Sequence, residues 1–140
     1  MDQLELREAQ LFRLLSECFG KDRIIPKARI SLVCGGNLPR LPEDQQIGYH
    51  EWVTGYRCLF TVINADDQPR LVVEFFSGFT KSIDPHEAER QRFLPSVLRI
   101  QKILYLTISD EEFSALLSPE EDVSLWQLIE CKLGDELEAL

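Results

Sequence analysis

The most constraining feature of this chain is an apolar β-hairpin that carries one carboxylate near its end. Residues 58–63 and 70–76 are dominated by apolar residues, many of them β-branched or aromatic, and the connection 64–69 is rich in turn-forming residues. Glu74 is the one acid in the second strand. A buried charge costs several kcal/mol unless another group pairs with it, so the sequence predicts a partner for Glu74. The candidates for a purely structural ion pair are Lys27, Arg29 and Lys81.

Length and composition indicate one ordinary globular domain. A chain of 140 residues with 44% hydrophobic and 28% charged residues fits a single domain over residues 1–140. No apolar run approaches the ~18 residues that a membrane span needs. The first residues lack the basic and apolar regions of a signal peptide. Cys18, Cys34, Cys58 and Cys131 form no CxxC pair, so we expect reduced core cysteines and a cytoplasmic location.

The net charge of −9 is unevenly distributed along the chain. Residues 109–140 hold ten acids and one lysine, whereas residues 1–108 hold fourteen acids and fourteen lysines and arginines. A duplex-binding domain normally carries a basic patch, so we expect DNA binding to be weak or absent. The main basic concentration could contact phosphates or form a solvated helix face; it consists of Lys81, Arg90, Arg92, Arg99 and Lys102.

Hydrophobic periodicity and capping residues predict the order of elements. The predicted elements are a helix over 3–19, a strand over 24–33, the hairpin, a helix from Asp84-Pro85 to about Ile100 and a strand over 103–108. Pro95 predicts a kink or an early break in the second helix. Residues 35–51 form a connection without a clear period, and Trp52 with Val53 gives a short apolar anchor. Two further helices follow the Ser109 cap and the box Ser118-Pro119-Glu120-Glu121.

This order is α-β-β-β-α-β over a core of residues 3–108, followed by an acidic helical extension over 109–140. A central hairpin with a helical crossover to a last strand predicts an α/β (α+β) fold with a mixed central sheet packed between helices.

Five segments combine this hydrophobic pattern with particular polar positions: Arg7–Phe12, Ile25–Ile30, Pro69–Glu74, Glu89–Leu94 and Ile103–Leu106. In these segments and in its order of elements, the chain resembles the PD-(D/E)xK restriction-endonuclease-like superfamily. It is most similar to a small, uncharacterised bacterial family of that fold that sometimes accompanies DNA-processing domains. The resemblance covers about residues 4–108 and implies a restriction-endonuclease-like core.

The resemblance also implies where a metal site would lie. In active members, an Asp on the first hairpin strand and the Glu on the second hold Mg²⁺, and a Lys or an acid two residues later completes the site. Here the Asp position falls on Cys58, Leu59 or Phe60, and Phe76 stands where the Lys or acid would be. One carboxylate rarely holds Mg²⁺ alone. The site that the resemblance implies is therefore dismantled, with Glu74 and the helix residue Glu8 remaining.

Three hypotheses follow. The first is a catalytically inactive endonuclease-like domain without a cofactor, retained as a protein-binding or regulatory module. The second is an active Mg- or Mn-dependent nuclease with a migrated site, in which Glu74 is a metal ligand and works with Glu8 and Lys27. A further acid would then come from the 35–51 connection; the candidates are Glu43, Asp44 and Glu51. The third is an unrelated α/β interaction protein. Lys27 and Glu8 could equally be solvated surface residues.

The C-terminal segment offers a second possible functional surface. Its apolar residues at helical spacing are Val123, Leu125, Trp126, Leu128, Ile129, Leu133 and Leu137. This face can dock on the domain's own core with acids facing solvent, or it can bind a protein partner or form a homodimer. His50 and His86 have no nearby nucleophile with an Asp partner, so a catalytic triad has little support.

Overall fold

The computed structural model of the chain describes residues 3–76, 85–134 and 136. Its helices are α1 (Gln3–Phe19), α2 (Ile30–Val33), α3 (Tyr49–Gly55), α4 (Pro85–Ile100), α5 (Asp110–Leu117) and α6 (Leu125–Leu133). The strands are β1 (Ile24–Arg29), β2 (Arg57–Ile63), β3 (Pro69–Phe76) and β4 (Leu104–Ser109). Two 3₁₀ turns, η1 (Lys21–Arg23) and η2 (Glu43–Gln45), complete the elements in these residues.

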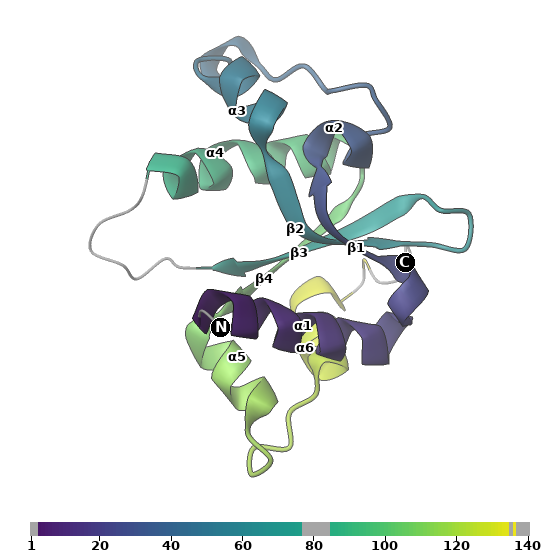
Figure 1. Cartoon of the computed structure of the whole chain (residues 1–140). Coiled ribbons are helices and arrows are strands. Elements are labelled where there is room, and N and C mark those ends of the chain that lie inside the picture. Colours follow the sequence, from purple (N-terminus) through teal and green to yellow (C-terminus); the bar gives the residue numbers. More distant parts are fainter. Residues whose placement is uncertain (1–2, 77–84, 135, 137–140) are drawn as a thin grey trace.

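The four strands form one mixed sheet in the order β1-β2-β3-β4. β1 pairs antiparallel with β2, and β2 pairs antiparallel with β3. β4 lies parallel to β3, with α4 between them in the sequence. The prediction of an α/β (α+β) fold with a mixed central sheet between helices is confirmed (Figure 1).

Two hydrophobic clusters cover the two faces of the sheet. Helices α2, α3 and α4 lie on one side of it, and α1, α5 and α6 lie on the other (Figure 1). Val72 belongs to the cluster of α2, α3 and α4, whereas Leu71 and Val73 belong to the cluster of α1, α5 and α6. Successive side chains of a strand point to opposite faces, so Glu74 shares the face of Val72.

Several elements agree with their local sequence signals. α1 occupies the predicted residues, with Leu11 and Leu15 fully buried one turn apart. The hairpin strands and the β4 strand lie within a residue or two of their predicted positions. Trp52 and Val53 are both buried, as expected for an apolar anchor, and they belong to α3. The Asp84 cap lies outside the described residues.

The predicted strand over 24–33 is wrong in its second half. β1 ends at Arg29, and residues 30–33 form the short helix α2. The helical turn brings Ile30 and Val33 to the same side, and both are buried in the core. A continued strand would place side chains three residues apart on opposite faces.

The predicted early break at Pro95 is also wrong, because α4 continues through it to Ile100. A proline inside a helix costs about 3 kcal/mol. Burial of four apolar side chains of α4 in the core offsets this cost; they are Phe93, Leu94, Val97 and Leu98.

The last helix begins later than predicted. Residues 118–121 form a turn, and α6 begins at Leu125 after a capping box between Ser124 and Gln127. This start brings Leu125 and Ile129, one turn apart, into the hydrophobic core beneath the sheet.

The predicted Ser109 cap of α5 is confirmed. The Ser109 hydroxyl accepts a hydrogen bond from the Glu112 backbone N–H, and the Glu112 carboxylate accepts one from the Ser109 N–H. Ser109→Ala is expected to lower the free energy of unfolding by about 1 kcal/mol, because it leaves the Glu112 N–H without its acceptor. Urea unfolding measures this change.

The matched control is Ser114→Ala, at an exposed position of the same helix. Alanine is the better helix former there, so this variant is expected to keep or slightly raise the stability. Equal losses in both variants would contradict the capping role.

Candidate functional site

Glu74 lies near the end of β3 and is buried, with 2% of its surface exposed. Its neighbours in the sheet are β2 on one side and β4 on the other, where Glu74 pairs with Thr107. A carboxylate in such a position needs hydrogen-bond donors and a counter-charge. The structure supplies both.

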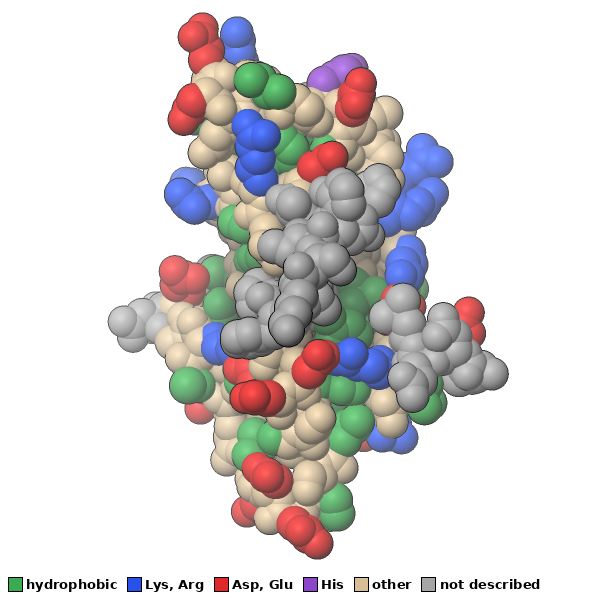
Figure 2. Space-filling view, turned by 90° about the vertical axis from the view of Figure 1, so that its left-hand side faces the viewer, with side chains coloured by type: hydrophobic (Ala, Val, Ile, Leu, Met, Phe, Trp, Pro, Cys, Tyr) green, Lys and Arg blue, Asp and Glu red, His purple; other side chains and the backbone are tan. Residues whose placement is uncertain are grey.

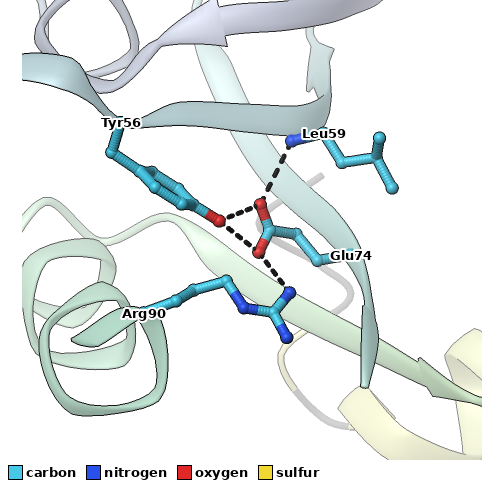
Figure 3. A network of polar contacts seen from close by, with 4 residues as sticks. All are labelled: Tyr56, Leu59, Glu74 and Arg90. Carbon is cyan, nitrogen blue, oxygen red and sulfur yellow. Dashed lines mark hydrogen bonds and ion pairs between the residues drawn. The ribbon is translucent and has the colours of Figure 1, made fainter. Parts of the chain in front are cut away.

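Three residues engage the Glu74 carboxylate (Figure 3). The Tyr56 hydroxyl lies 2.5 Å from Oε1 and 2.6 Å from Oε2, and the Leu59 backbone N–H donates to Oε1 at 3.1 Å. The Arg90 guanidinium donates to Oε2 at 2.8 Å and forms an ion pair. Both carboxylate oxygens are therefore occupied, and the negative charge is compensated.

The Leu59 hydrogen bond shows what this carboxylate does for the sheet. The register of β2 against β3 runs from Ile63 opposite Pro69 to Phe60 opposite Val73. Leu59 is the next residue of β2, and its N–H donates to the Glu74 side chain. The side chain thus provides an acceptor for β2 where the backbone pairing with β3 ends.

Arg90 comes from α4, the helix above this face of the sheet, and only 8% of its surface is exposed. Burial opposes the charged form of Arg90, but the charge and hydrogen bond of Glu74 outweigh it, so the pKa of Arg90 is raised. Arg90 therefore remains a cation, and each member of the pair supports the charge of the other.

Tyr56 is held in place by aromatic packing. Its ring stacks on the Trp52 ring, with the two ring centroids 4.7 Å apart. The ring centroids of Trp52 and Phe93 are 5.4 Å apart. Burial and the neighbouring Glu74 charge both raise the pKa of Tyr56. The phenol therefore keeps its proton and donates a hydrogen bond to the carboxylate.

Burial, followed by the charge of Glu74, also raises the pKa of Cys58 and that of Tyr105. Cys58 is consequently held as a thiol and has no nucleophilic thiolate. Cys34 is buried too, and burial raises its pKa to about 11. Cys131 is exposed, so the expectation of four core cysteines is wrong at this position, which lies on the outer side of α6.

The expected partners of Glu74 are replaced by another residue. Lys27 donates instead to Glu8 across 2.9 Å, and Arg29 is exposed, while Lys81 lies outside the described residues. Arg90 is the partner because α4 packs directly over the face to which Glu74 points.

The sheet separates Glu74 from Glu8. Glu8 belongs to α1, whose buried residues pack with Leu71 and Val73 on one face. Glu74 contacts Arg90 of α4 on the other face. The structure therefore brings Glu8 and Lys27 together as a surface pair, and it does not bring them to Glu74.

These residues do not fit a magnesium ion. Mg²⁺ needs several oxygen ligands at once. Both oxygens of the Glu74 carboxylate instead accept hydrogen bonds, from Arg90, from the Tyr56 hydroxyl and from the Leu59 backbone N–H. Glu43, Asp44 and Glu51 are all exposed. In the part of the chain that the structure describes, no group of three His, Cys, Asp or Glu residues could hold a metal ion.

The predicted basic face loses one of its members, and another, Lys81, lies outside the described residues. Arg90 is buried in its ion pair, and the guanidinium of Arg92 lies 4.9 Å from the centre of the Phe93 ring. Arg99 and Lys102 are exposed. The predicted basic face therefore lacks Arg90. His50 is exposed in α3, and the side chain of His86 lies outside the described residues.

The apolar face of α6 packs against the chain itself. Leu125 and Ile129 are buried with residues of α1 and β4. The ring of Trp126 packs edge-on against the ring of Phe19, with centroids 5.9 Å apart, and 41% of the surface of Trp126 remains exposed. Dimerisation through this helix stays a prediction.

Across residues 3–76 and 85–134, no helix is long and apolar enough to span a membrane.

Sequence reasoning missed Tyr56 and placed Arg90 among solvated cations. One signal pointed to them: a carboxylate on an apolar strand requires donors, and both residues lie close to predicted apolar elements.

Comparisons with protein-family models, with curated proteins and with solved structures found no match for this chain.

Proposed function

We propose that this chain is a catalytically inactive, endonuclease-like domain that acts as a protein-binding or regulatory module. The observation that carries the proposal is the state of Glu74. Its carboxylate accepts hydrogen bonds from Tyr56, Leu59 and Arg90, so Arg90 supplies the counter-charge that a metal ion would otherwise supply.

The endonuclease-like part of the proposal is supported by the order of elements. The chain runs from α1 to β1, then through α2 and α3 to the antiparallel strands β2 and β3, and then through α4 to β4, which is parallel to β3. This succession is compatible with the predicted α-β-β-β-α-β order if the short helices α2 and α3 are counted as part of the connection between β1 and β2. Glu74 stands on the second hairpin strand, and Leu59, one of the three positions where the Asp would fall, contributes only its backbone N–H.

The protein-binding part is supported by charge. The chain carries a net charge of −9, and acidic side chains gather at the end of the molecule where α5 and the turn after it lie (Figure 2). Asp110, Glu111, Glu120 and Glu121 are exposed there. Such a surface repels phosphate backbones and attracts basic protein segments.

The proposal predicts that millimolar Mg²⁺ or Mn²⁺ leaves the melting temperature unchanged. A ligand that binds only the folded state must raise its stability, so a specific metal site would show a rise in melting temperature. We also expect no Mn²⁺-dependent cleavage of single-stranded, duplex or supercoiled DNA. A metal-dependent nuclease of known activity serves as the positive control.

The variant Glu74→Gln distinguishes a rebuilt active site from a contaminant. Cleavage by the wild-type protein that disappears in a folded Glu74→Gln variant would overturn the proposal. Cleavage that is equal in both proteins would point to a contaminating nuclease, and a Glu51→Gln variant would then be expected to cleave equally as well.

A further inference from the structure

We propose that a cationic pocket at the end of β1 binds an acidic segment of a partner protein that also carries an apolar side chain. The inference rests on the proposed protein-binding function, because it names the chemistry of a partner. The pocket has a volume of about 710 Å³ and lies where the end of β1, α2 and the start of β2 meet. Its lining includes Lys27, Arg29, Leu32, Gly35, Gly36 and Arg57.

The two arginines of the pocket come from directly opposite positions of the sheet. Arg29 of β1 and Arg57 of β2 are register partners in the antiparallel ladder, and both are exposed. Like charges at directly opposite positions destabilise a sheet. Within the described residues, neither arginine forms an ion pair. The pair therefore favours an external anion, because an anion between the two guanidinium groups offsets their repulsion.

Positive charge is a local property of this part of the chain. Residues 23–42 contain four lysines and arginines and no acid, although the whole chain has a net charge of −9. The Arg57 guanidinium donates to the Lys27 carbonyl at 3.0 Å, which holds it beside the pocket. Lys27 is already paired with Glu8, so the uncompensated charge is that of the two arginines.

A carboxylate suits this pair of arginines. The guanidinium group presents its N–H donors in a planar fork that matches the two oxygens of a carboxylate. The pocket volume lies well within the range of about 300 to 1,000 Å³ that ligand sites occupy, so it has room for more than one side chain.

Apolar surface in the pocket favours a protein segment over a nucleic-acid backbone. Leu32 lines the pocket and is 65% exposed. Gly35 and Gly36 keep their part of the pocket open, since a Cβ atom built on either meets nothing within 4 Å. An apolar side chain of an acidic segment covers Leu32 while neighbouring carboxylates reach the arginines. A phosphate backbone has no such group, and the net charge of the chain repels it.

The test uses a short capped peptide that alternates Glu and Leu, titrated into the full chain at low salt and followed by calorimetry. The first matched peptide carries Gln in place of each Glu. We expect the acidic peptide to bind at least about tenfold more tightly, since about 1.4 kcal/mol corresponds to tenfold. Equal binding of the two peptides, or no binding, would overturn the inference.

A second matched peptide keeps each Glu and carries Gly in place of each Leu. It should bind several-fold more weakly than the peptide with Leu, because it leaves Leu32 uncovered. Binding as tight as that of the peptide with Leu would contradict the role of the apolar surface.

Protein variants locate the site. Arg29→Gln and Arg57→Gln should each weaken binding several-fold, and Leu32→Asp should abolish it by placing a negative charge in the pocket. Arg13→Gln removes an exposed cation of α1, on the other side of the sheet from α2, and should change nothing (Figure 1). Circular dichroism confirms that each variant is folded. Retained binding in folded Leu32→Asp would place the peptide elsewhere.

The melting temperature separates a binding role from a structural one. Arg29→Gln should leave it unchanged or raise it slightly, because the substitution removes the repulsion from Arg57. A clear drop in the melting temperature of Arg29→Gln would assign the arginine to structure and contradict the inference.

Two further probes identify the source of the anion. A duplex oligonucleotide or free glutamate that binds as tightly as the peptide would overturn the assignment to a protein segment. The proposed function fails on a different readout, because DNA cleavage does not depend on peptide binding. A chain that binds the acidic peptide and also cleaves DNA would retain this site and lose the proposed function.

Discussion

Glu74→Ala is expected to lower the free energy of unfolding by about 3–5 kcal/mol. The substitution removes one charge of the buried Glu74–Arg90 ion pair, and it removes the acceptor of the Tyr56 hydroxyl and the Leu59 N–H. A folded domain is typically stable by only about 5–15 kcal/mol, so this single change removes a large part of the total. Urea unfolding at neutral pH measures it.

The surface pair is the matched control. Glu8→Ala breaks an ion pair with Lys27 whose lysine side chain is 54% exposed, and the expected loss is about 0–1 kcal/mol. The double variant Glu74→Leu with Arg90→Leu should recover part of the stability, because both charges of this buried pair are then removed together. A Glu74→Ala loss as small as that of Glu8→Ala would contradict the structural role of the network.

Raising the pH above about 10 is expected to destabilise the protein steeply. Burial raises the pKa of Tyr49, Tyr56 and Tyr105, and the Glu74 charge raises it further in Tyr56 and Tyr105. In the unfolded chain, each phenol loses its proton near pH 10, whereas the folded chain retains it. The contribution of these neutral phenols to stability is fully present below about pH 10, and it is lost as the pH rises toward the raised native pKa values.

The expected slope follows from the protons that unfolding releases. Each retained proton lowers the free energy of unfolding by about 1.4 kcal/mol per pH unit, so Tyr56 and Tyr105 together give about 3 kcal/mol per pH unit. The near-ultraviolet absorbance of tyrosinate should stay low while the protein is folded and rise in one step as it unfolds. Tyr105→Phe should reduce the slope by the contribution of one proton, about 1.4 kcal/mol per pH unit. A tyrosine that titrates near pH 10 with unchanged circular dichroism would refute the expectation.

Local signals were sufficient for some elements because the interactions that form them lie within a few residues. α1 has apolar residues one turn apart, the hairpin has a turn rich in Asn and Asp, and α5 begins at a Ser109–Glu112 box. The same kind of signal failed at the last helix. Ser118 and Ser124 both begin a plausible box, and burial of Leu125 and Ile129 in the core favours the second.

The sequence by itself determined that Glu74 sits on an apolar strand and that a buried carboxylate there requires a partner. Only the tertiary structure decided that the partner is Arg90, that Tyr56 donates the second contact and that Glu8 lies across the sheet. The physical reason is that residue alternation along a strand indicates which side chains share a face, but not which helix covers that face. The packing of α4 and α3 over β3 made that choice.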